Sequence, residues 1–578
     1  MADMLFSFRS LPFVCAALCA ASSPAQFNYQ YAYAMGGSAT AAAMQVVTDA
    51  AGNVYITGHF QGVADMDPGP GMVELTSAGG NDLFLAKHSP TGVLLWAQAV
   101  GGAGDDIAAD LALDDAGNIY MSASIATEVD MDPGPGVVNV SFAGGFGDAC
   151  LAKYDTDGHC LWAFSIGGTE HDVINRLAFD PSSGNIVAGG QSSSPLMDLD
   201  PGSGVQNVSN DGNGSFFLAV YDADGSYQWG FSGNGSLSSS VGGLVADGLG
   251  NLYVGGVFSA TSSIDVDPGP GTVVLTAAGG VGDDIWVAKY SSDGTYQWAR
   301  TIGDVGDEEL AGMAVDAGGE NIYFTGFFTT NLDLDPGPGS YVVSPGGMED
   351  IYLEKMDSAG DFVWAVNAGG SSTDIGNSVT VDNGTVYACG RFAGVVDFDP
   401  GPAVNELIGQ GQSNDLFVAA YDESGSLLAA MGIGGTGYDD AYGITTGPTG
   451  LLHVVGAFSS GTLDMDPGPA TANIAAAGSV AAFHAAYTFI STGIDEPTVN
   501  ALSLRPNPAS GHIWIDAPGT ALENPTVIIM DPMGRAVLQG TMHARAGLDV
   551  QHLVPGSYVA VVLDAQGRWL GAMRWVKE

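Results

Sequence analysis

Pairs of aspartates recur along this sequence in one short motif, Asp-x-Asp-Pro-Gly. Two carboxylates two residues apart, followed by a turn that exposes backbone carbonyls, supply the hard oxygen ligands that Ca²⁺ prefers. The motif therefore predicts structural Ca²⁺, held weakly, with a dissociation constant on the order of 10⁻⁴ to 10⁻³ M as in extracellular modules. The expected ligands are Asp65, Asp67, Asp130, Asp132, Asp198, Asp200, Asp265, Asp267, Asp333, Asp335, Asp397, Asp399, Asp464 and Asp466.

The same aspartates have a purely structural alternative. Aspartate in a turn accepts hydrogen bonds from the backbone of that turn. The motif also lacks the third acid and the glutamate of a complete calcium loop. Both interpretations, metal ligand and turn acceptor, stay open from the sequence.

Catalytic chemistry is only weakly indicated. Seven equivalent motifs cannot all be one active site, so a catalyst needs residues that break the repetition. His59 and Arg391 do so and could bind an anionic ligand, although a lone residue at a strand end more often packs or faces solvent. The sequence has no His-x-x-x-His pair, nucleophile elbow or phosphate loop. We therefore expect no enzyme and no catalytic residue; the alternative is an extracellular polysaccharide hydrolase or lyase with a site in a central channel.

The motif recurs every 64 to 68 residues, which indicates one structural unit copied seven times. Each unit reads as four short strands, as at 44–47, 54–58, 82–87 and around Trp96, separated by Gly, Asn and Asp turns. Seven such units predict an all-β fold, a seven-bladed β-propeller. An open β-solenoid is the alternative, but its coils are shorter.

The two ends of the array support a ring. The seventh unit ends without a fourth strand, whereas residues 27–37 match the fourth strands of other units, such as 96–102. An N-terminal strand that completes the last blade leaves no open edge. We therefore expect a propeller over residues 26–492, with the Asp-x-Asp-Pro-Gly loops and the acidic loops after each fourth strand on one shared interaction face.

One tryptophan recurs per unit in the fourth strand of five units. A residue that recurs at the same place in most blades belongs to the core between blades rather than to a sugar-binding surface. The five are Trp96, Trp162, Trp229, Trp298 and Trp364.

The repeat itself is similar to a known family. Gly-Asn-x-Tyr-x-x-Gly, then Asp-x-x-x-Ala-Lys, then Trp-x-x-x-x-Gly-Gly resembles the bacterial β-propeller repeat family of secreted proteins. The resemblance covers roughly residues 27–490 and implies the fold without implying an activity. The Asp-x-Asp-Pro-Gly loop is longer than that family usually has, so the resemblance says least about this loop.

The N-terminus predicts export. Arg9, an apolar run over 11–21 and a small-residue site ending at Ala25 form a signal peptide, residues 1–25. The run is too short to cross a membrane, which takes about 20 residues, and no later segment is long enough. A lipid-modified Cys19 is the alternative. Cleavage leaves three cysteines, an odd number that we expect in the core rather than in disulfides: Cys150, Cys160 and Cys389.

Residues 504–578 differ from the repeats. The segments 504–510 (LRPNPAS), 527–535 (VIIMDPMGR) and 553–559 (LVPGSYV) read as strands with tight turns, a small β-sandwich. They resemble the type A C-terminal sorting domain of the type IX secretion system of Bacteroidetes. The resemblance implies outer-membrane translocation, removal of this domain near a linker at 493–503, and release or attachment to surface lipopolysaccharide. A small adhesive sandwich that stays attached is the alternative.

Charge narrows the choice of partners. The chain has 64 acidic and 14 basic residues, a net charge of -50, which disfavours nucleic acid and anionic lipid. We expect an exported, monomeric binding or structural module, extracellular or attached to the cell surface. Its expected partners are the type IX secretion machinery, through residues 504–578, and an unidentified extracellular protein or polysaccharide.

Overall fold

The computed structural model describes two parts of the chain. Ala25–Ile490 forms one compact unit, and the residues after it belong to another. The first part is described except for 68, 70, 211–212, 234–237, 260 and 412. The second is described at 503–505, 511–516, 526–530, 536–541, 547–563 and 569–577. The expected signal peptide up to residue 24 and the linker up to residue 502 lie outside the described residues.

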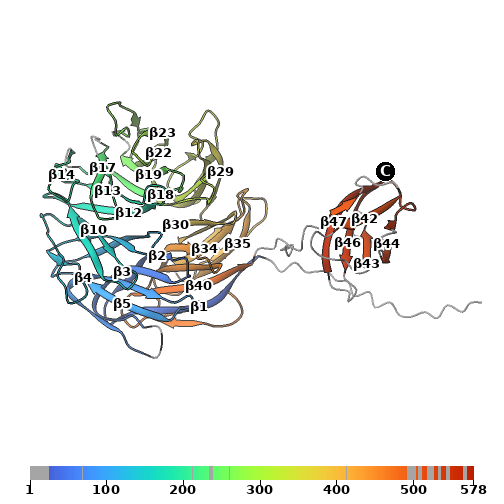
Figure 1. Ribbon diagram of the computed structural model, residues 1–578, viewed down its shortest axis with the longest axis horizontal. Helices are drawn as coiled ribbons and strands as arrows, with labels where there is room; N and C mark the ends of the chain where they lie inside the picture. Colours follow the sequence, from blue (N-terminus) through green and yellow to red (C-terminus); the bar gives the residue numbers. More distant parts are fainter. Residues whose placement is uncertain are drawn as a thin grey trace, which may run out of the picture. The chain divides into compact units, whose positions relative to one another are not determined.

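Every regular element in the described residues is a β-strand, so the protein is all-β there. None of the described residues forms a helix long and apolar enough to cross a membrane. Ala25–Ile490 contains seven four-stranded antiparallel units, here called repeats 1 to 7 in chain order. Within each repeat the first strand pairs with the second, the second with the third and the third with the fourth (Figure 1).

The strands have the following bounds. The first strands are β2 (Ala41–Thr48), β6 (Ile107–Leu113), β12 (Asp172–Asp180), β18 (Ser239–Ala246), β24 (Glu308–Val315), β30 (Ile375–Asp382) and β36 (Asp439–Thr446). The second strands are β3 (Val54–Asp65), β7 (Ile119–Ile125), β13 (Asn185–Ser192), β19 (Asn251–Ser259), β25 (Asn321–Phe328), β31 (Thr385–Phe392) and β37 (Leu451–Phe458). The third strands are β4 (Glu74–His88), β10 (Asp148–Tyr154), β16 (Ser215–Tyr221), β22 (Asp283–Ser291), β28 (Asp350–Asp357), β34 (Asp415–Tyr421) and β40 (Ala481–Ile490). The fourth strands are β5 (Leu94–Val100), β11 (Cys160–Ile166), β17 (Tyr227–Ser232), β23 (Tyr296–Ile302), β29 (Phe362–Ala368), β35 (Leu427–Ile433) and β1 (Gln26–Gly37).

The fourth strand of repeat 7 comes from the N-terminus. β1 pairs antiparallel with β40, from Gln26 opposite Ile490 to Met35 opposite Ala482, and Figure 1 shows the blue β1 beside the orange end of the array. β1 also pairs with β3 through Gly36 and Gly37, which joins repeats 7 and 1 in one eight-stranded sheet. The pairing predicted for residues 27–37 is therefore confirmed.

The hydrophobic cores lie between consecutive repeats. The second and third strands are apolar on both faces, and every residue of β10 is buried, as expected for strands covered on both sides. One core cluster joins Tyr120 of repeat 2 to Phe217 of repeat 3, and another joins Tyr33 of β1 to Phe84 of repeat 1. First strands of neighbouring repeats also contact each other, including β36 with β2.

Short hairpins extend each repeat between its second and third strands. The Asp-x-Asp-Pro-Gly loop closes each hairpin, and in repeat 1 the hairpin is continuous with β3 and β4. For this reason β3 runs to Asp65, beyond the 54–58 predicted from the sequence. The other hairpins pair β8 (Val129–Asp130) with β9 (Asn139–Val140), β14 (Leu196–Asp198) with β15 (Asn207–Ser209), β20 (Ser263–Asp265) with β21 (Val274–Thr276), β26 (Leu332–Asp333) with β27 (Val342–Val343), β32 (Val395–Asp397) with β33 (Glu406–Ile408), and β38 (Thr462–Asp464) with β39 (Asn473–Ala475).

The C-terminal part has two sheets of its own. Ile513, Val527 and Tyr558 come from both sheets and belong to one buried cluster, so the sheets share a core. The first sheet contains β41 (Ser503–Arg505), β42 (His512–Asp516) and β45 (Leu548–Asp549). The second contains β44 (Ala536–Thr541), β43 (Thr526–Met530), β46 (Gly556–Leu563) and β47 (Trp569–Lys577).

Candidate binding pocket

A pocket of about 310 Å³ lies where the seven first strands come together. Its lining includes at least one residue from each of these strands. Every first strand has a register shift at the same place, and such a bulge re-aims the residues beside it. The residues skipped by the shift are Met44, Ala109, Asn175, Gly242, Ala311, Asn377 and Tyr442.

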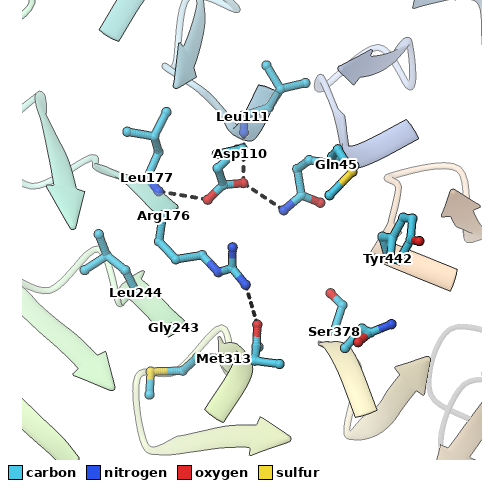
Figure 2. A pocket seen from close by; sticks show the side chains of 15 residues that line it. Gln45, Asp110, Leu111, Arg176, Leu177, Gly243, Leu244, Met313, Ser378 and Tyr442 are labelled. Carbon is cyan, nitrogen blue, oxygen red and sulfur yellow. Dashed lines mark hydrogen bonds between the residues drawn. The ribbon is translucent and has the colours of Figure 1, made fainter. Parts of the chain in front are cut away.

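The polar side chains of this pocket break the repetition. Asp110 is 4% exposed, and its Oδ1 accepts hydrogen bonds from Gln45 Nε2 and the Leu111 N–H, both at 2.8 Å. Its Oδ2 accepts the N–H of Leu177 at 2.8 Å. Figure 2 shows the Asp110 carboxylate between Leu177 and Gln45. The three repeats that supply these groups are thereby connected at the pocket wall.

Arg176 extends from repeat 3 across the pocket. Its Nε donates to the Gly242 carbonyl at 2.8 Å, its Nη1 to the Asn175 carbonyl at 2.8 Å, and its Nη2 to the Ala311 carbonyl. The bulges of repeats 4 and 5 therefore hold the guanidinium in place. Figure 2 shows the Arg176 side chain extending across the pocket. No salt bridge joins it to a carboxylate in the described part of the chain. Its charge and remaining N–H groups are available to a ligand.

Burial sets the electrostatics of Asp110. Burial raises the pKa of Asp110 above the ordinary value of an aspartate, while the charge of Arg176 and the N–H of Leu177 act in the opposite direction. A carboxyl group and a guanidinium in one small polar pocket provide both acceptors and donors of hydrogen bonds. Such a lining suits a polar ligand with several hydroxyl groups.

Arg391 is in a second polar cluster beside the pocket. Its Nη1 lies 2.7 Å from Oδ2 of the buried Asp440, which also accepts the Tyr438 hydroxyl at 3.0 Å. Asn377, which lines the pocket, donates to Asp440 Oδ1 at 2.8 Å. The Arg391 charge is therefore balanced within the protein. His59, the other residue singled out by the sequence, has a pKa lowered by burial.

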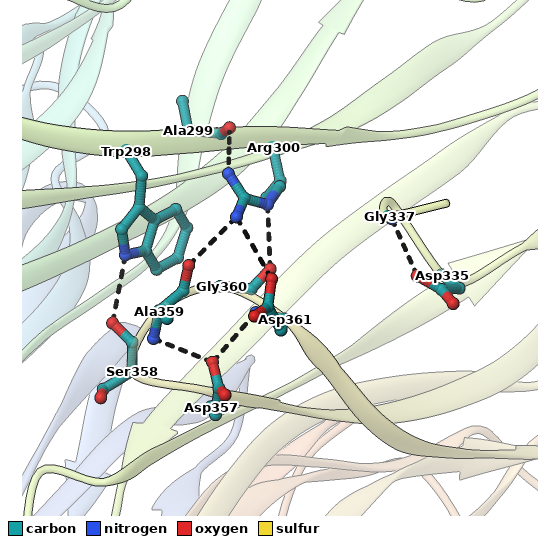
Figure 3. Close-up of polar contacts among 10 residues, drawn as sticks. All are labelled: Trp298, Ala299, Arg300, Asp335, Gly337, Asp357, Ser358, Ala359, Gly360 and Asp361. Carbon is teal, nitrogen blue, oxygen red and sulfur yellow. Dashed lines mark hydrogen bonds and ion pairs between the residues drawn. The ribbon is translucent and has the colours of Figure 1, made fainter. Parts of the chain in front are cut away.

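The Asp-x-Asp-Pro-Gly loops repeat one hydrogen-bonding pattern seven times. In repeat 5, Asp333 Oδ1 accepts the N–H groups of Asp335 at 3.2 Å and Tyr341 at 2.7 Å. Asp335 Oδ1 accepts the N–H of Gly337 at 2.8 Å, as Figure 3 shows. The other six loops have the same three bonds. All fourteen aspartates therefore act as turn acceptors through Oδ1.

The Asp-x-Asp-Pro-Gly loop of repeat 4 lies beside fourth strands. Asp267 and Pro268 share a surface hollow with Trp229 of repeat 3 and Tyr296 of repeat 4. The residue between the two aspartates anchors the loop there, because Val266 is fully buried and its carbonyl accepts the Tyr290 hydroxyl at 2.8 Å. The expectation of one face shared with the acids after the fourth strands stays a prediction.

Ca²⁺ binding by the loop aspartates stays a prediction. The structure brings each pair together within its own loop. Across the described residues, no group of three or more His, Cys, Asp or Glu side chains could hold a metal ion. A cation at any such loop would therefore have at most two carboxylate ligands.

The repeated tryptophans make contacts between repeats. Trp298 Nε1 and Lys289 Nζ both donate to the Ser358 carbonyl of the next repeat, at 3.1 and 3.2 Å. Gly360 has a φ of +78°, and a Cβ there would lie 2.9 Å from the Trp298 ring. Arg300 Nε donates to the Gly360 carbonyl at 2.9 Å (Figure 3). Trp162, Trp229 and Trp364 donate to equivalent carbonyls.

The cysteines carry no chemistry in the described residues. Cys150, Cys160 and Cys389 are free thiols, the first and last of them buried. Burial raises the pKa of the Cys160 thiol to about 12, and that of Cys389 well above its ordinary value. Thiols of this kind are unreactive at neutral pH.

Sequence reasoning missed the polar residues of the pocket. It searched for broken symmetry after the second strand, where His59 and Arg391 lie, rather than in the first strand. An alignment of the first strands contains the signal, because the residue after the bulge is Gln, Asp or Arg in repeats 1 to 3 and Gly or Ser in repeats 4 to 7. These residues are Gln45, Asp110, Arg176, Gly243, Gly312, Ser378 and Gly443.

Comparison with known proteins identifies the C-terminal part. Residues 503–570 match the secretion system C-terminal sorting domain. This domain directs export through the type IX secretion system to the cell surface or the extracellular space. The chain is therefore a secreted protein of the Bacteroidetes type, and its sorting domain is the segment that the secretion machinery recognises.

Curated relatives match parts of the repeat region. The chain is 26% identical over 368 residues to the regulatory protein FlaEY of Caulobacter vibrioides, covering 60% of this chain and 36% of that protein. It is 24% identical over 246 residues to an uncharacterised WD repeat-containing protein of Acanthamoeba polyphaga mimivirus, covering 39% and 17%. The chain thus spans about a third of the length of the first relative and about a sixth of the second.

Solved structures give distant matches. A protein of unknown function from Dyadobacter fermentans is 12% identical, with 66% of this chain and 97% of that chain covered and a TM-score of 0.32. The extracellular domain of a putative one-component system from B. thetaiotaomicron is 10% identical, with 96% and 99% covered and a TM-score of 0.20.

Proposed function

We propose that Ala25–Ile490 is a seven-bladed β-propeller of the bacterial β-propeller repeat type, exported as a monomeric binding module. The pairing of β1 with β40 and the core cluster shared by repeats 7 and 1 support a ring of seven blades. One curated relative is named for WD repeats, which build propellers in other proteins. The sorting domain places the module outside the cell.

The ligand site of this module is the pocket at the seven first strands. One observation carries the assignment: the backbone of the first strands repeats, but their pocket side chains do not. Gln45, Asp110 and Arg176 occupy positions that are glycine or serine in repeats 4 to 7. A purely structural ring has no need of one Arg and one Asp there. The ligand class that fits these donors and acceptors is a saccharide portion of an extracellular polysaccharide or glycoprotein.

The module binds without turnover. The carboxylate that lines the pocket, Asp110, already accepts three hydrogen bonds from the protein. Glycoside hydrolysis generally uses two carboxyl groups, one of them a proton donor. A polysaccharide hydrolase or lyase acting in the same channel is the second candidate, and the assay below separates the two.

The test is an oligosaccharide microarray probed with the purified chain, followed by calorimetry with the best glycan. We expect Arg176→Met to weaken binding at least tenfold, because it removes the free charge and N–H donors. Arg300→Met is the matched control, since Arg300 also bonds carbonyls of the next repeat but lies outside the pocket. Equal affinity of Arg176→Met and the unchanged chain would refute the pocket. Release of new reducing ends from the bound glycan would establish the enzymatic candidate instead.

A further inference from the structure

A second set of acids lies where consecutive repeats meet. In five repeats the start of the third strand carries an aspartate, and an acid stands 24 residues later, at the start of the next repeat's first strand. These are the junction pairs: Asp82 with Asp106, Asp148 with Asp172, Asp284 with Glu308, Asp350 with Asp374, and Asp415 with Asp439.

The two acids of a junction pair are present together or absent together. Where repeat 3 meets repeat 4, both positions are serine, Ser215 and Ser239. Where repeat 7 meets repeat 1, both are alanine, Ala481 and Ala41. An acid that only capped its own loop would have no need of the other. Joint presence therefore indicates that the two side chains share one task.

The junction pairs are buried and incompletely bonded. All ten acids are at most 2% exposed. Oδ2 of Asp82 accepts the Ala78 N–H at 2.8 Å, and Oδ2 of Asp350 accepts the Gly346 N–H at 2.7 Å. In all five third-strand aspartates, however, Oδ1 is buried with no hydrogen-bond partner in the described residues. A buried, unpaired carboxylate oxygen is costly, so a fivefold repetition points to a ligand at this atom.

The two carboxylates of a pair face one small space. A Cβ on Gly167 would lie 3.0 Å from Asp172 Oδ2 and 3.2 Å from Asp148 Oδ1. Equivalent glycines lie against the aspartate of the other four pairs, and a Cβ on Gly369 would lie 2.0 Å from Asp350 Cγ. The glycine that directly follows the fourth strand thus makes room for the carboxylate in each of the five pairs.

No lysine or arginine among the residues that the structure describes forms an ion pair at these sites. In the described part of the chain, the ion pairs of Lys and Arg go to Asp114, Asp361 and Asp440, none of them a junction acid. Two buried carboxylates in one space repel each other unless a proton or a cation lies between them. At the junction of repeats 4 and 5, Oε1 of Glu308 and Oγ1 of Thr330 are also buried with no partner among the described residues.

We propose that each junction pair binds one divalent cation, Ca²⁺, which holds consecutive repeats together. Two carboxylates balance the charge of the ion, and an all-oxygen site suits Ca²⁺ rather than a transition metal. Backbone carbonyls and water complete coordination in calcium sites with few acidic ligands. The site is separate from the Asp-x-Asp-Pro-Gly loops, whose bonds to Oδ1 are all satisfied.

The test counts bound Ca²⁺ on the purified chain by equilibrium dialysis and elemental analysis, after chelation and return of Ca²⁺ to millimolar levels. We expect one ion for each junction pair, five in all. Asp284→Asn combined with Glu308→Gln keeps the shape of both side chains and removes the charge, so it lowers the count by one. Asp333→Asn combined with Asp335→Asn, in the loop of repeat 5, leaves the count unchanged.

A variant that adds a calcium site keeps the test valid even if the variants that remove a site fail to fold. Ser215→Asp combined with Ser239→Asp installs a junction pair where repeats 3 and 4 meet, and we expect one additional ion. Binding of no Ca²⁺ by the folded chain overturns the proposal. So does a count that falls with the loop variant and not with the junction variant, because the loops would then be the calcium sites. Both outcomes leave the saccharide pocket untouched, since Arg176 takes no part in either set of acids.

Discussion

The Asp-x-Asp-Pro-Gly loops and the junction pairs contain the same residue types but differ in what surrounds them. In the loops, backbone N–H groups bind Oδ1 of every aspartate. Burial raises the pKa of Asp333, but the N–H groups of Tyr341 and Asp335 outweigh this and hold the pKa below the ordinary value. In the junction pairs, burial raises the pKa of Asp148 to about 6, and the charge of Asp172 adds to the effect. The loop aspartates, which are close in the sequence, therefore have their hydrogen bonds satisfied within the loop. The junction acids come together only in the fold, and one oxygen of each third-strand aspartate has no partner among the described residues.

The largest loss of stability is expected from a substitution that fills the space beside a junction pair. Gly369→Ala places a Cβ 2.0 Å from Asp350 Cγ, so the carboxylate must move and lose the N–H of Gly346. We expect the free energy of unfolding to fall by about 3 kcal/mol, as in other overpacked interiors, and the Ca²⁺ count to fall by one. Chemical denaturation measures the first quantity. Gly461→Ala is the control, because no atom lies within 4 Å of its Cβ, and a similar loss there would contradict the steric explanation.

The next largest loss of stability is expected in the Asp-x-Asp-Pro-Gly loops, where the first aspartate should matter more than the second. Asp333→Ala leaves two backbone N–H groups without an acceptor, and Asp335→Ala leaves one. At about 1 kcal/mol for each lost bond, we expect losses of about 2 and about 1 kcal/mol. Asp333→Asn keeps an oxygen acceptor and should cost less than Asp333→Ala in Ca²⁺-free buffer. Equal losses for the two alanine variants would show that the turn bonds are not what the aspartates contribute.

The interface of repeats 7 and 1 contains a cluster of histidines, with His88 beside Tyr33 and His484, and should respond to pH. His453 Nδ1 lies 3.0 Å from His484 Nε2, and His484 Nδ1 lies 2.8 Å from the Tyr33 hydroxyl. Both ring nitrogens of His88 are buried without partners in the described residues. Burial lowers the pKa of His88 to about 3 and that of His453 to about 4.

Acid should therefore destabilise this junction. Below pH 6.5 the unfolded histidines bind protons and the folded ones do not, so stability falls as the pH falls toward 4. Each of the two histidines contributes a loss of about 1.4 kcal/mol per pH unit in this range. We expect His88→Gln to flatten the dependence of Tm on pH between 7 and 5, and the partly exposed His171→Gln to leave it nearly unchanged. An unaltered slope in His88→Gln would refute this assignment.

The fold and part of the candidate sites could be predicted from the sequence. The period of 64 to 68 residues gave the seven four-stranded repeats and the completion of the last one by residues 27–37. The constant spacing of 24 residues in the junction pairs was also present in the sequence. This spacing did not predict a site, because the two acids of a pair begin different strands and are separated in the sequence by a whole fourth strand. A turn motif, by contrast, is contiguous in the sequence. The role of Arg176 could not be read at all, since its partners Gly242 and Ala311 are backbone carbonyls of other repeats.

The sequence by itself determined the all-β repeats, the positions of the Asp-x-Asp-Pro-Gly turns and the sorting domain, because each depends on residues close together in the chain. Only the tertiary structure decided which acids lose their solvent and face each other. It also decided that the variable residues of seven first strands line one pocket. Burial and like-charge contact depend on what packs beside a residue, and in this protein that neighbour belongs to the next repeat.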